Sequence, residues 1–236
     1  GKVLDVKTAQ VAGKLTLNGV DPVNGADCVR RPAAEKARVV FSETAKGYGF
    51  TLPLSCSDRA FTFAGVVYPG TYRVTAFGVA GSGASYSNLP TVEYVADGAL
   101  SVTADLTGKV FDIKTVEVGG KVTLNGADLT NGADCMRRPS AEKVRIVYSD
   151  TSKGYTFTLP MICADPAFTF AGTVYPGTYR ISVAGVTDGG ARYSELPAQA
   201  FVANPALVLA GDMKGQVLVV KTVRVAGKVT LNSADP

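Results

Sequence analysis

The sequence repeats itself with a period of 107 residues, and this period limits the possible folds more than any other feature. The run VYPGTYR begins at Val67 and again at Val174, with no insertion or deletion between the copies. A period this long is typical of a tandem array of whole domains, each with its own hydrophobic core. The predicted divisions are a first module at 1–108, a second at 109–215, and the first strand or strands of an incomplete third at 216–236.

Each copy has the pattern of a β-protein. The segment YTFTLP at Tyr155–Pro160 alternates apolar residues with threonines, which is typical of a strand with one buried face. About seven such segments are separated by Asn-Gly, Lys-Gly and Pro-Gly turn signals, and no stretch offers a helical apolar stripe. Gly120 interrupts one predicted strand and suggests a bulge or a bend. The sequence therefore predicts an all-β chain, made of tandem seven-stranded antiparallel β-sandwich modules, an architecture that immunoglobulin-like domains share. The residues expected in the cores are Phe63, Tyr72, Phe170 and Tyr179.

Composition argues against several classes of function. The chain has 236 residues, of which 46% are hydrophobic, and its net charge is +4. It contains no histidine, the usual general base and the commonest metal ligand, and no tryptophan. The charge is too small to indicate nucleic-acid binding, and no apolar run approaches the ~18 residues of a membrane span. We therefore expect no enzyme, no cofactor, no metal site, no nucleic-acid partner and no membrane span in this segment.

The four cysteines fall two to a module, and none forms a CxxC motif. The expected pairs are Cys28–Cys56 and Cys135–Cys163, one disulfide per module, made in an oxidising compartment. By the chain-entropy model each would contribute about 3.5 kcal/mol. A redox or metal site is the weaker interpretation, because histidine and close cysteine pairs are missing. Bridging between modules remains an alternative at this stage.

The modules resemble the carboxypeptidase regulatory-like domains and the collagen-adhesin B-type repeats. The matching elements are VGGKVTLNGAD and, later, FTFAGTVYPGTYRISVAG. In the second element the matched positions are Phe168, Phe170, Gly172, Pro176, Gly177 and Tyr179, with the first-module equivalents Phe61, Phe63, Gly65, Pro69, Gly70 and Tyr72. The resemblance implies a transthyretin-like sandwich of the kind repeated in bacterial surface and secreted proteins, where such modules are spacers, stalks or adhesive units. The cysteine pair and the inserted segment at 131–143 depart from the pattern.

Two sets of polar side chains are candidates for binding. An arginine pair follows the first cysteine of each module, and a recurring contact to an acidic polysaccharide or to a neighbouring chain would suit its planar donors. A solvated loop is the plainer interpretation, which we favour. These arginines are Arg30, Arg31, Arg137 and Arg138. Among the tyrosines, Tyr86 and Tyr193 lie in predicted loops and are the better candidates for a sugar-binding surface, although packing is the favoured role.

These observations favour a structural extracellular or cell-surface repeat protein that forms a stiff stalk or filament, over an accessory carbohydrate- or ligand-binding module. Its expected partners are neighbouring copies of itself or further modules of the same chain, with a cell-surface polysaccharide as a further candidate. Residues 217–236 are interpreted as part of a longer array or as strands donated to a neighbour's sheet edge. The residues that would be donated are Val223, Val225, Val229 and Leu231.

Overall fold

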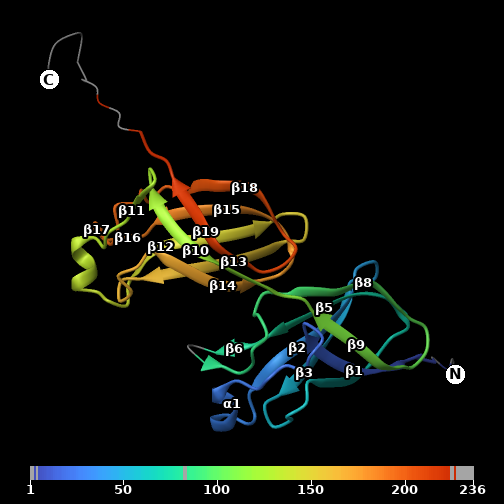
Figure 1. The fold of residues 1–236 in the computed structure, drawn as a ribbon. Helices are drawn as coiled ribbons and strands as arrows, with labels where there is room; N and C mark the ends of the chain where they lie inside the picture. Colours follow the sequence, from blue (N-terminus) through green and yellow to red (C-terminus); the bar gives the residue numbers. More distant parts are fainter. Residues whose placement is uncertain (1–2, 4, 82–83, 224–225, 227–236) are drawn as a thin grey trace.

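The chain forms two β-sandwiches joined end to end (Figure 1). The computed structural model describes residues 3, 5–81, 84–223 and 226. In each sandwich a sheet with three principal strands packs on a four-stranded sheet, which gives seven principal strands in the described part of each module. The prediction of an all-β sandwich is therefore confirmed.

The first sandwich combines the sheet β4–β1–β9 with the sheet β3–β2–β5–β8. Its strands are β1 Ala9–Leu17, β2 Glu35–Glu43, β3 Tyr48–Ser55, β4 Thr62–Val67, β5 Gly70–Gly78, β8 Tyr94–Val102 and β9 Leu106–Ile113. The second combines the sheet β14–β10–β19, in which the two-residue strand β11 also pairs with β10, with the sheet β13–β12–β15–β18. Its strands are β10 Val116–Leu124, β12 Glu142–Asp150, β13 Tyr155–Ile162, β14 Thr169–Val174, β15 Gly177–Gly185, β18 Phe201–Leu209 and β19 Met213–Val220.

The loops of both sandwiches contain short helices and two-residue strands. The single-turn helix α1 and the 3₁₀ helix η1 occupy equivalent positions after the first strand of each module, and both carry a cysteine. Their bounds, and those of the two-residue strands, are α1 Ala26–Arg30, η1 Ala133–Met136, β6 Ala80–Gly81, β7 Ala84–Ser85, β11 Ala127–Asp128, β16 Thr187–Asp188 and β17 Ala191–Arg192. No helix among the described residues is long and apolar enough to cross a membrane.

One strand pair in each sandwich is parallel, where the sequence predicts an antiparallel fold. β9 lies parallel to β1, with Leu106 opposite Val11 and Ile113 opposite Leu17. β19 pairs with β10 in the same way. The other principal pairs are antiparallel, for example β2 with β3 and β5. The last strand of each module crosses from the four-stranded to the three-stranded sheet, and such a crossing leaves no mark in the alternation of residues.

The last strand of each module places the module boundary later in the sequence than the repeat period does. β9 runs through residue 108, where the period places the end of the first module, and it completes the first sandwich. β19 likewise places residues 216–220 in the second sandwich, not in a third. A period gives the length of a repeat but not the point in the cycle where the fold begins. By strand pairing, the two sandwiches end at Ile113 and Val220.

The tail beyond β19 was expected to supply strands. Val223 is described and is exposed, outside any strand. Val225, Val229 and Leu231 lie outside the described residues. Strand donation by these four residues therefore stays a prediction.

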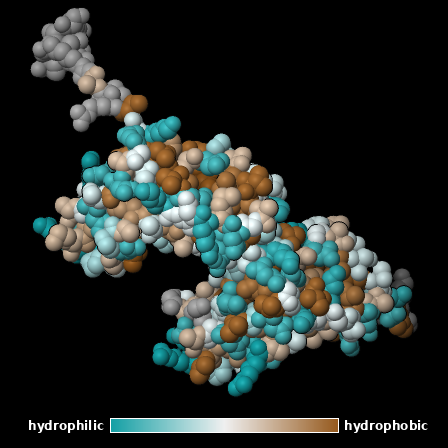
Figure 2. All heavy atoms as spheres, viewed as in Figure 1, coloured by the Kyte–Doolittle hydropathy of each residue, from teal (hydrophilic) through white to brown (hydrophobic). Residues whose placement is uncertain are grey.

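The core lies between the two sheets of each module and contains the expected aromatic residues. Phe63, Tyr72, Phe170 and Tyr179 are at most 7% exposed, so their predicted burial is confirmed. In the first sandwich the Phe63 ring stacks on Phe111 of β9 at 5.4 Å between centroids. Edge-to-face and offset contacts of this kind add to the stabilisation that burial provides. Figure 2 shows polar residues over much of the visible face of both sandwiches, with some patches of apolar residues between them.

Candidate functional site

The two sandwiches meet at an aromatic contact, which we call the joint. It consists of Tyr94 and the adjacent backbone of Val92 and Val95 from the first sandwich, and of Tyr155 and Tyr175 from the second. The Tyr94 ring lies 4.9 Å from that of Tyr175 and 6.4 Å from that of Tyr155, between centroids. Tyr94 begins β8, Tyr155 begins β13, and Tyr175 lies in the turn between β14 and β15, so the joint is built from facing ends of strands.

Hydrogen bonds to the backbone accompany these ring contacts. The hydroxyl of Tyr175 donates to the carbonyl oxygen of Val92, and the amide of Val95 donates to the hydroxyl of Tyr155 at 3.3 Å. Tyr155 is 4% exposed and Tyr175 is fully buried. Burial raises the pKa of both tyrosines. Both hydroxyls therefore keep their protons at neutral pH, and the bond that Tyr175 donates is maintained.

The linker through the joint is short and tied down. Only Lys114 and Thr115 lie between β9 and β10. The amide of Thr115 donates to Oδ1 of Asn18 at 2.9 Å, and Nδ2 of Asn18 donates to Oγ1 of Thr115 at 2.8 Å. Asn18 has a φ of 53°, a left-handed conformation that asparagine adopts more readily than most residues. This reciprocal pair fixes the direction in which the chain leaves the first sandwich.

The second sandwich has the same reciprocal pair of hydrogen bonds, a clasp between asparagine and threonine, where the chain leaves it after β19. The amide of Thr222 donates to Oδ1 of Asn125 at 2.9 Å, and Nδ2 of Asn125 donates to Oγ1 of Thr222 at 3.0 Å. Asn125 also has a φ of 53°. The exit direction is thus a property of the repeat and does not depend on a following sandwich.

A notch opens beside the joint, where the space-filling view shows the two sandwiches touching at one corner (Figure 2). A groove at the joint is lined by three cationic side chains, together with Tyr94 and Tyr155, whose rings are stacked. The cations are Arg73, Lys114 and Lys153, and Lys114 forms an ion pair with Asp112. The groove therefore offers positive charge beside aromatic rings.

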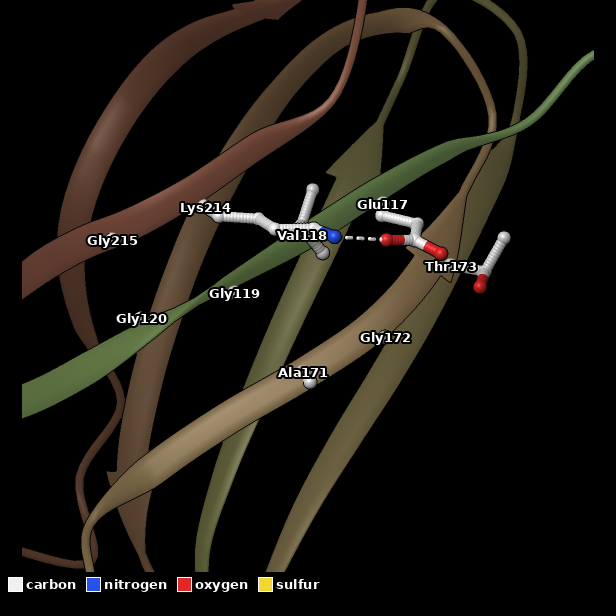
Figure 3. Close-up of a pocket in the computed structure, with 9 residues that line it drawn as sticks. All are labelled: Glu117, Val118, Gly119, Gly120, Ala171, Gly172, Thr173, Lys214 and Gly215. Carbon is white, nitrogen blue, oxygen red and sulfur yellow. Dashed lines mark ion pairs between the residues drawn. The ribbon is translucent and has the colours of Figure 1, made fainter.

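A second hollow lies on the outer face of the sheet β14–β10–β19 (Figure 3). Its wall is an exposed ion pair, in which Nζ of Lys214 lies 2.5 Å from a carboxylate oxygen of Glu117. Its floor contains Gly120, where a Cβ atom would lie 2.0 Å from the carbonyl oxygen of Gln216. The register between β10 and β19 shifts at this point, which confirms the predicted bulge. The hollow results from the close approach of two backbones, so we assign it to the fold and not to a ligand.

The arginine pairs divide into two roles. Nη1 of Arg31 donates to the hydroxyl of Tyr86 at 3.0 Å, and Nη1 of Arg138 donates to the hydroxyl of Tyr193 at the same distance. Arg138 also pairs with Asp188 at 2.7 Å. The second arginine of each pair is thus held by its own loop. Arg30 and Arg137 are exposed, and a contact to a polyanion or a neighbouring chain stays a prediction for them.

The two loop tyrosines are buried, not displayed. Tyr86 is 6% and Tyr193 is 2% exposed. Each packs in a small cluster with the cysteines of its module, which form the expected pairs Cys28–Cys56 and Cys135–Cys163. These tyrosines stabilise the disulfide-linked loops and do not present a platform for a sugar ring.

Each sandwich also contains a buried lysine, which the alternation of apolar and polar residues does not indicate. Lys143 has no exposed surface, and its Nζ donates to Oδ1 of Asn131 and to the carbonyl oxygen of Ala167, both at 2.9 Å, and to that of Asp165. The Nζ also lies 4.1 Å from the centroid of the Phe168 ring. Lys36 makes the equivalent contacts in the first sandwich. We call each of these arrangements a lysine clasp, since it ties the inserted segment to the loop before β4 or β14.

No family model and no curated protein matches the chain. Among solved structures, it is similar to a putative adhesin from Bacteroides ovatus ATCC 8483, with 11% identity, 94% of each chain covered and a TM-score of 0.33. A second putative adhesin from Bacteroides ovatus has 9% identity, with 75% of this chain and 74% of that one covered, and a TM-score of 0.35. A leucine-rich repeat protein from Bacteroides thetaiotaomicron has 15% identity and a TM-score of 0.31, with 91% of this chain covered. The chain spans only 26% of that protein's length. At such low identities and TM-scores, none of these likenesses defines a function for this chain.

Proposed function

We propose that this chain is a structural part of an extracellular or cell-surface protein, in which β-sandwich modules joined end to end form a stiff stalk or filament. The observation that carries the proposal is the joint. Tyr175 is fully buried there and bonded to the backbone of the other sandwich, while a linker of two residues is clasped by Asn18. A flexible connection between independent binding modules would need neither feature.

The covalent design of the modules supports the same role. Each sandwich is closed by a disulfide, which is typical of proteins made in an oxidising compartment. Among the described residues, no group of three or more acidic or cysteine side chains could hold a metal ion. The proposed role needs no catalytic centre, and it agrees with the resemblance to repeat modules of bacterial surface proteins.

Distances between spin labels test the stiffness of the joint. One nitroxide would be attached at each of the equivalent exposed positions Thr51→Cys and Thr158→Cys, since the native cysteines are all in disulfides. We expect a narrow distance distribution for this doubly labelled chain. The control carries a Gly-Ser-rich insertion between Lys114 and Thr115, which should broaden the distribution. A distribution equally broad without the insertion would show that the sandwiches move independently, and the stalk proposal would then be wrong.

One observation favours an accessory ligand-binding role as the second candidate function. The groove beside the joint brings Arg73, Lys114 and Lys153 next to Tyr155, a combination that suits an acidic polysaccharide. Calorimetric titration with an anionic polysaccharide, such as polygalacturonate, would test it. Salt-sensitive binding that is lost on replacing Arg73 and Lys153 with glutamine would support this role. Equal heats from the native chain and the variant would exclude the groove as the site.

A further inference from the structure

The first sandwich carries a second copy of the tyrosine side of the joint, at the end away from the second sandwich. The equivalents of Tyr155 and Tyr175 are Tyr48 and Tyr68. Their ring centroids lie 5.5 Å apart, against 4.9 Å for Tyr155 and Tyr175. We call Tyr48, Tyr68 and the adjacent Phe50 the tyrosine pole. Its two tyrosine rings are in edge-to-face contact, as the equivalent rings are in the joint.

The same backbone contact positions both turns. The hydroxyl of Tyr72 donates to the carbonyl oxygen of Tyr68 at 2.5 Å, and that of Tyr179 donates to the carbonyl oxygen of Tyr175 at 2.8 Å. The difference between the two copies is their exposure. Tyr68 is 42% exposed, whereas Tyr175 is fully buried because the first sandwich covers it. The tyrosine pole is therefore a preformed half of the joint without its cover.

The second sandwich carries the other half of a joint at its own far end. Phe201 and Val202 are the equivalents of Tyr94 and Val95. Phe201 begins β18 opposite Val183, as Tyr94 begins β8 opposite Ala76. Phe201 and Val202 are both half-buried. We call Phe201, Val202 and the backbone of Gln199 the phenylalanine pole.

The substitutions between the two copies keep the contacts of the joint. Phe201 retains the ring that Tyr94 places against the two tyrosines of the second sandwich. Gln199 stands where Val92 does, and it is the backbone carbonyl of Val92, not its side chain, that accepts the tyrosine hydroxyl. The bond to Tyr155 likewise comes from a backbone amide. The phenylalanine pole can therefore make both backbone hydrogen bonds and the ring contacts.

From these two poles we propose that the tyrosine pole is a docking site for the phenylalanine pole of a second copy of this chain. The contact would repeat the joint between molecules. It is a head-to-tail contact between different surfaces, so that its repetition extends a chain of copies and does not close a dimer. This inference rests on the proposed stalk or filament and names the surfaces that would extend it.

Of the described residues before β1 and after β19, none belongs to a strand that would have to be broken first. Val3 and residues 5–8 belong to no strand, and Val3 and Val6 are 92% and 67% exposed. At the other end, the clasp of Thr222 by Asn125 directs the chain out of the second sandwich as it does at the joint. The contact is small, because the joint involves one corner of each sandwich (Figure 2). We therefore expect weak, concentration-dependent association.

Sedimentation velocity with the full chain, up to millimolar concentration, tests the proposal. The native chain should form species that grow with concentration. Tyr68→Arg blocks the tyrosine pole and Phe201→Arg blocks the phenylalanine pole, and each variant alone should associate at least about tenfold more weakly, as expected when a central aromatic contact is lost. Val110→Arg, on an exposed position in the middle of β9, is the matched control and should associate as the native chain does.

The mixture of the two variants is the sharpest measurement. Each variant keeps the pole that the other lacks, so an equimolar mixture should form heterodimers that grow no further. Circular dichroism of the separate variants checks that both remain folded. A native chain that stays monomeric, or a mixture that does not dimerise, would overturn the proposal. If spin-label distances across the internal joint are still narrow in that case, the stalk proposal stands and docking between copies alone is wrong.

Discussion

Replacing Lys143 with methionine should destabilise the second sandwich by about 3 kcal/mol. Methionine has nearly the length of the lysine stem, so the packing beside Phe168 is kept while the ammonium group is lost. Three oxygen atoms lose their donor, namely Oδ1 of Asn131 and the carbonyl oxygens of Asp165 and Ala167. The inserted segment would then no longer be tied to the loop before β14.

The expected loss of stability is the difference between two effects, the cost of the lost hydrogen bonds and the gain from no longer burying a charge. Removing the buried donor leaves three acceptors unsatisfied, and each unsatisfied acceptor costs about 1–3 kcal/mol. The lysine itself is desolvated, which lowers its pKa from the ordinary value, and that cost disappears in the variant. The hydrogen bonds are only partly buried, so water can reach some of the abandoned oxygens. These two effects place the expected loss at the lower end of the range.

Hydrogen exchange resolved by peptide makes this loss measurable in the full chain. A loss of about 3 kcal/mol should speed the exchange of globally protected amides in the second sandwich by about a hundredfold. The first sandwich serves as the internal reference, and Lys36→Met should reverse the pattern. Lys121→Met is the matched control, since Lys121 is exposed and makes a surface ion pair with Asp128. It should change stability by less than about 0.5 kcal/mol. If Lys143→Met changes exchange no more than this control, the clasp does not stabilise the fold.

Three further predictions concern the core, the loops and alkaline pH. Phe170→Ala should cost about 3–5 kcal/mol in denaturant unfolding, because the ring is 7% exposed in a packed core; a loss below about 1 kcal/mol would contradict its core role. Replacing Cys135 and Cys163 together with alanine should cost about 3.5 kcal/mol, since the bridge closes a separation of 28 residues; an unchanged melting temperature would contradict this. Burial raises the pKa of Tyr148 to about 12, whereas a tyrosine in the unfolded chain titrates near about 10. Its contribution to stability is therefore complete below about pH 10 and is lost as pH rises through about 12, so tyrosinate absorbance should report a late phase that coincides with unfolding.

The strands and the core could be predicted because alternation reports directly on burial. Phe63, Tyr72, Phe170 and Tyr179 follow this rule and are buried. Lys143 does not, because the register of β12 against β13 shifts between Glu142 and Val144. At such a bulge two consecutive residues can both face inward, and both Lys143 and Val144 are fully buried. The alternation of apolar and polar residues does not reveal the bulge, so the lysine clasp could not be predicted from the sequence.

The joint could not be predicted for a different reason. Tyr155 and Tyr175 have the sequence pattern of ordinary packed residues, and their partner Tyr94 stands in another module. Contacts between modules depend on the direction in which the linker leaves, which is set by the clasp between Asn18 and Thr115. The period of the sequence does not show which residues of two modules are in contact. It shows only that a contact between one pair of modules can recur between the next pair.

The position of the module boundary leads to a last prediction, on fragments. A fragment of residues 8–115 contains the whole first sandwich and should fold. A fragment of residues 1–108, which follows the period, lacks most of β9. It loses Phe111 and Ile113, which are 2% and 0% exposed, and each such side chain contributes about 1.5–3 kcal/mol through burial.

The loss is larger than these two side chains, because β1 is also left with an open edge where β9 had paired. The Phe63 ring would lose its stacking partner. Residues 1–6 repeat the sequence of residues 108–113 closely. A segment that directly precedes a strand cannot turn back to lie parallel to it, so only another molecule could supply the missing strand. Any rescue would therefore depend on concentration. Urea unfolding of both fragments at micromolar concentration gives the comparison, with at least about 3 kcal/mol expected between them. Equal stabilities would mean that β9 is not part of the first sandwich, and the boundary derived from strand pairing would be wrong.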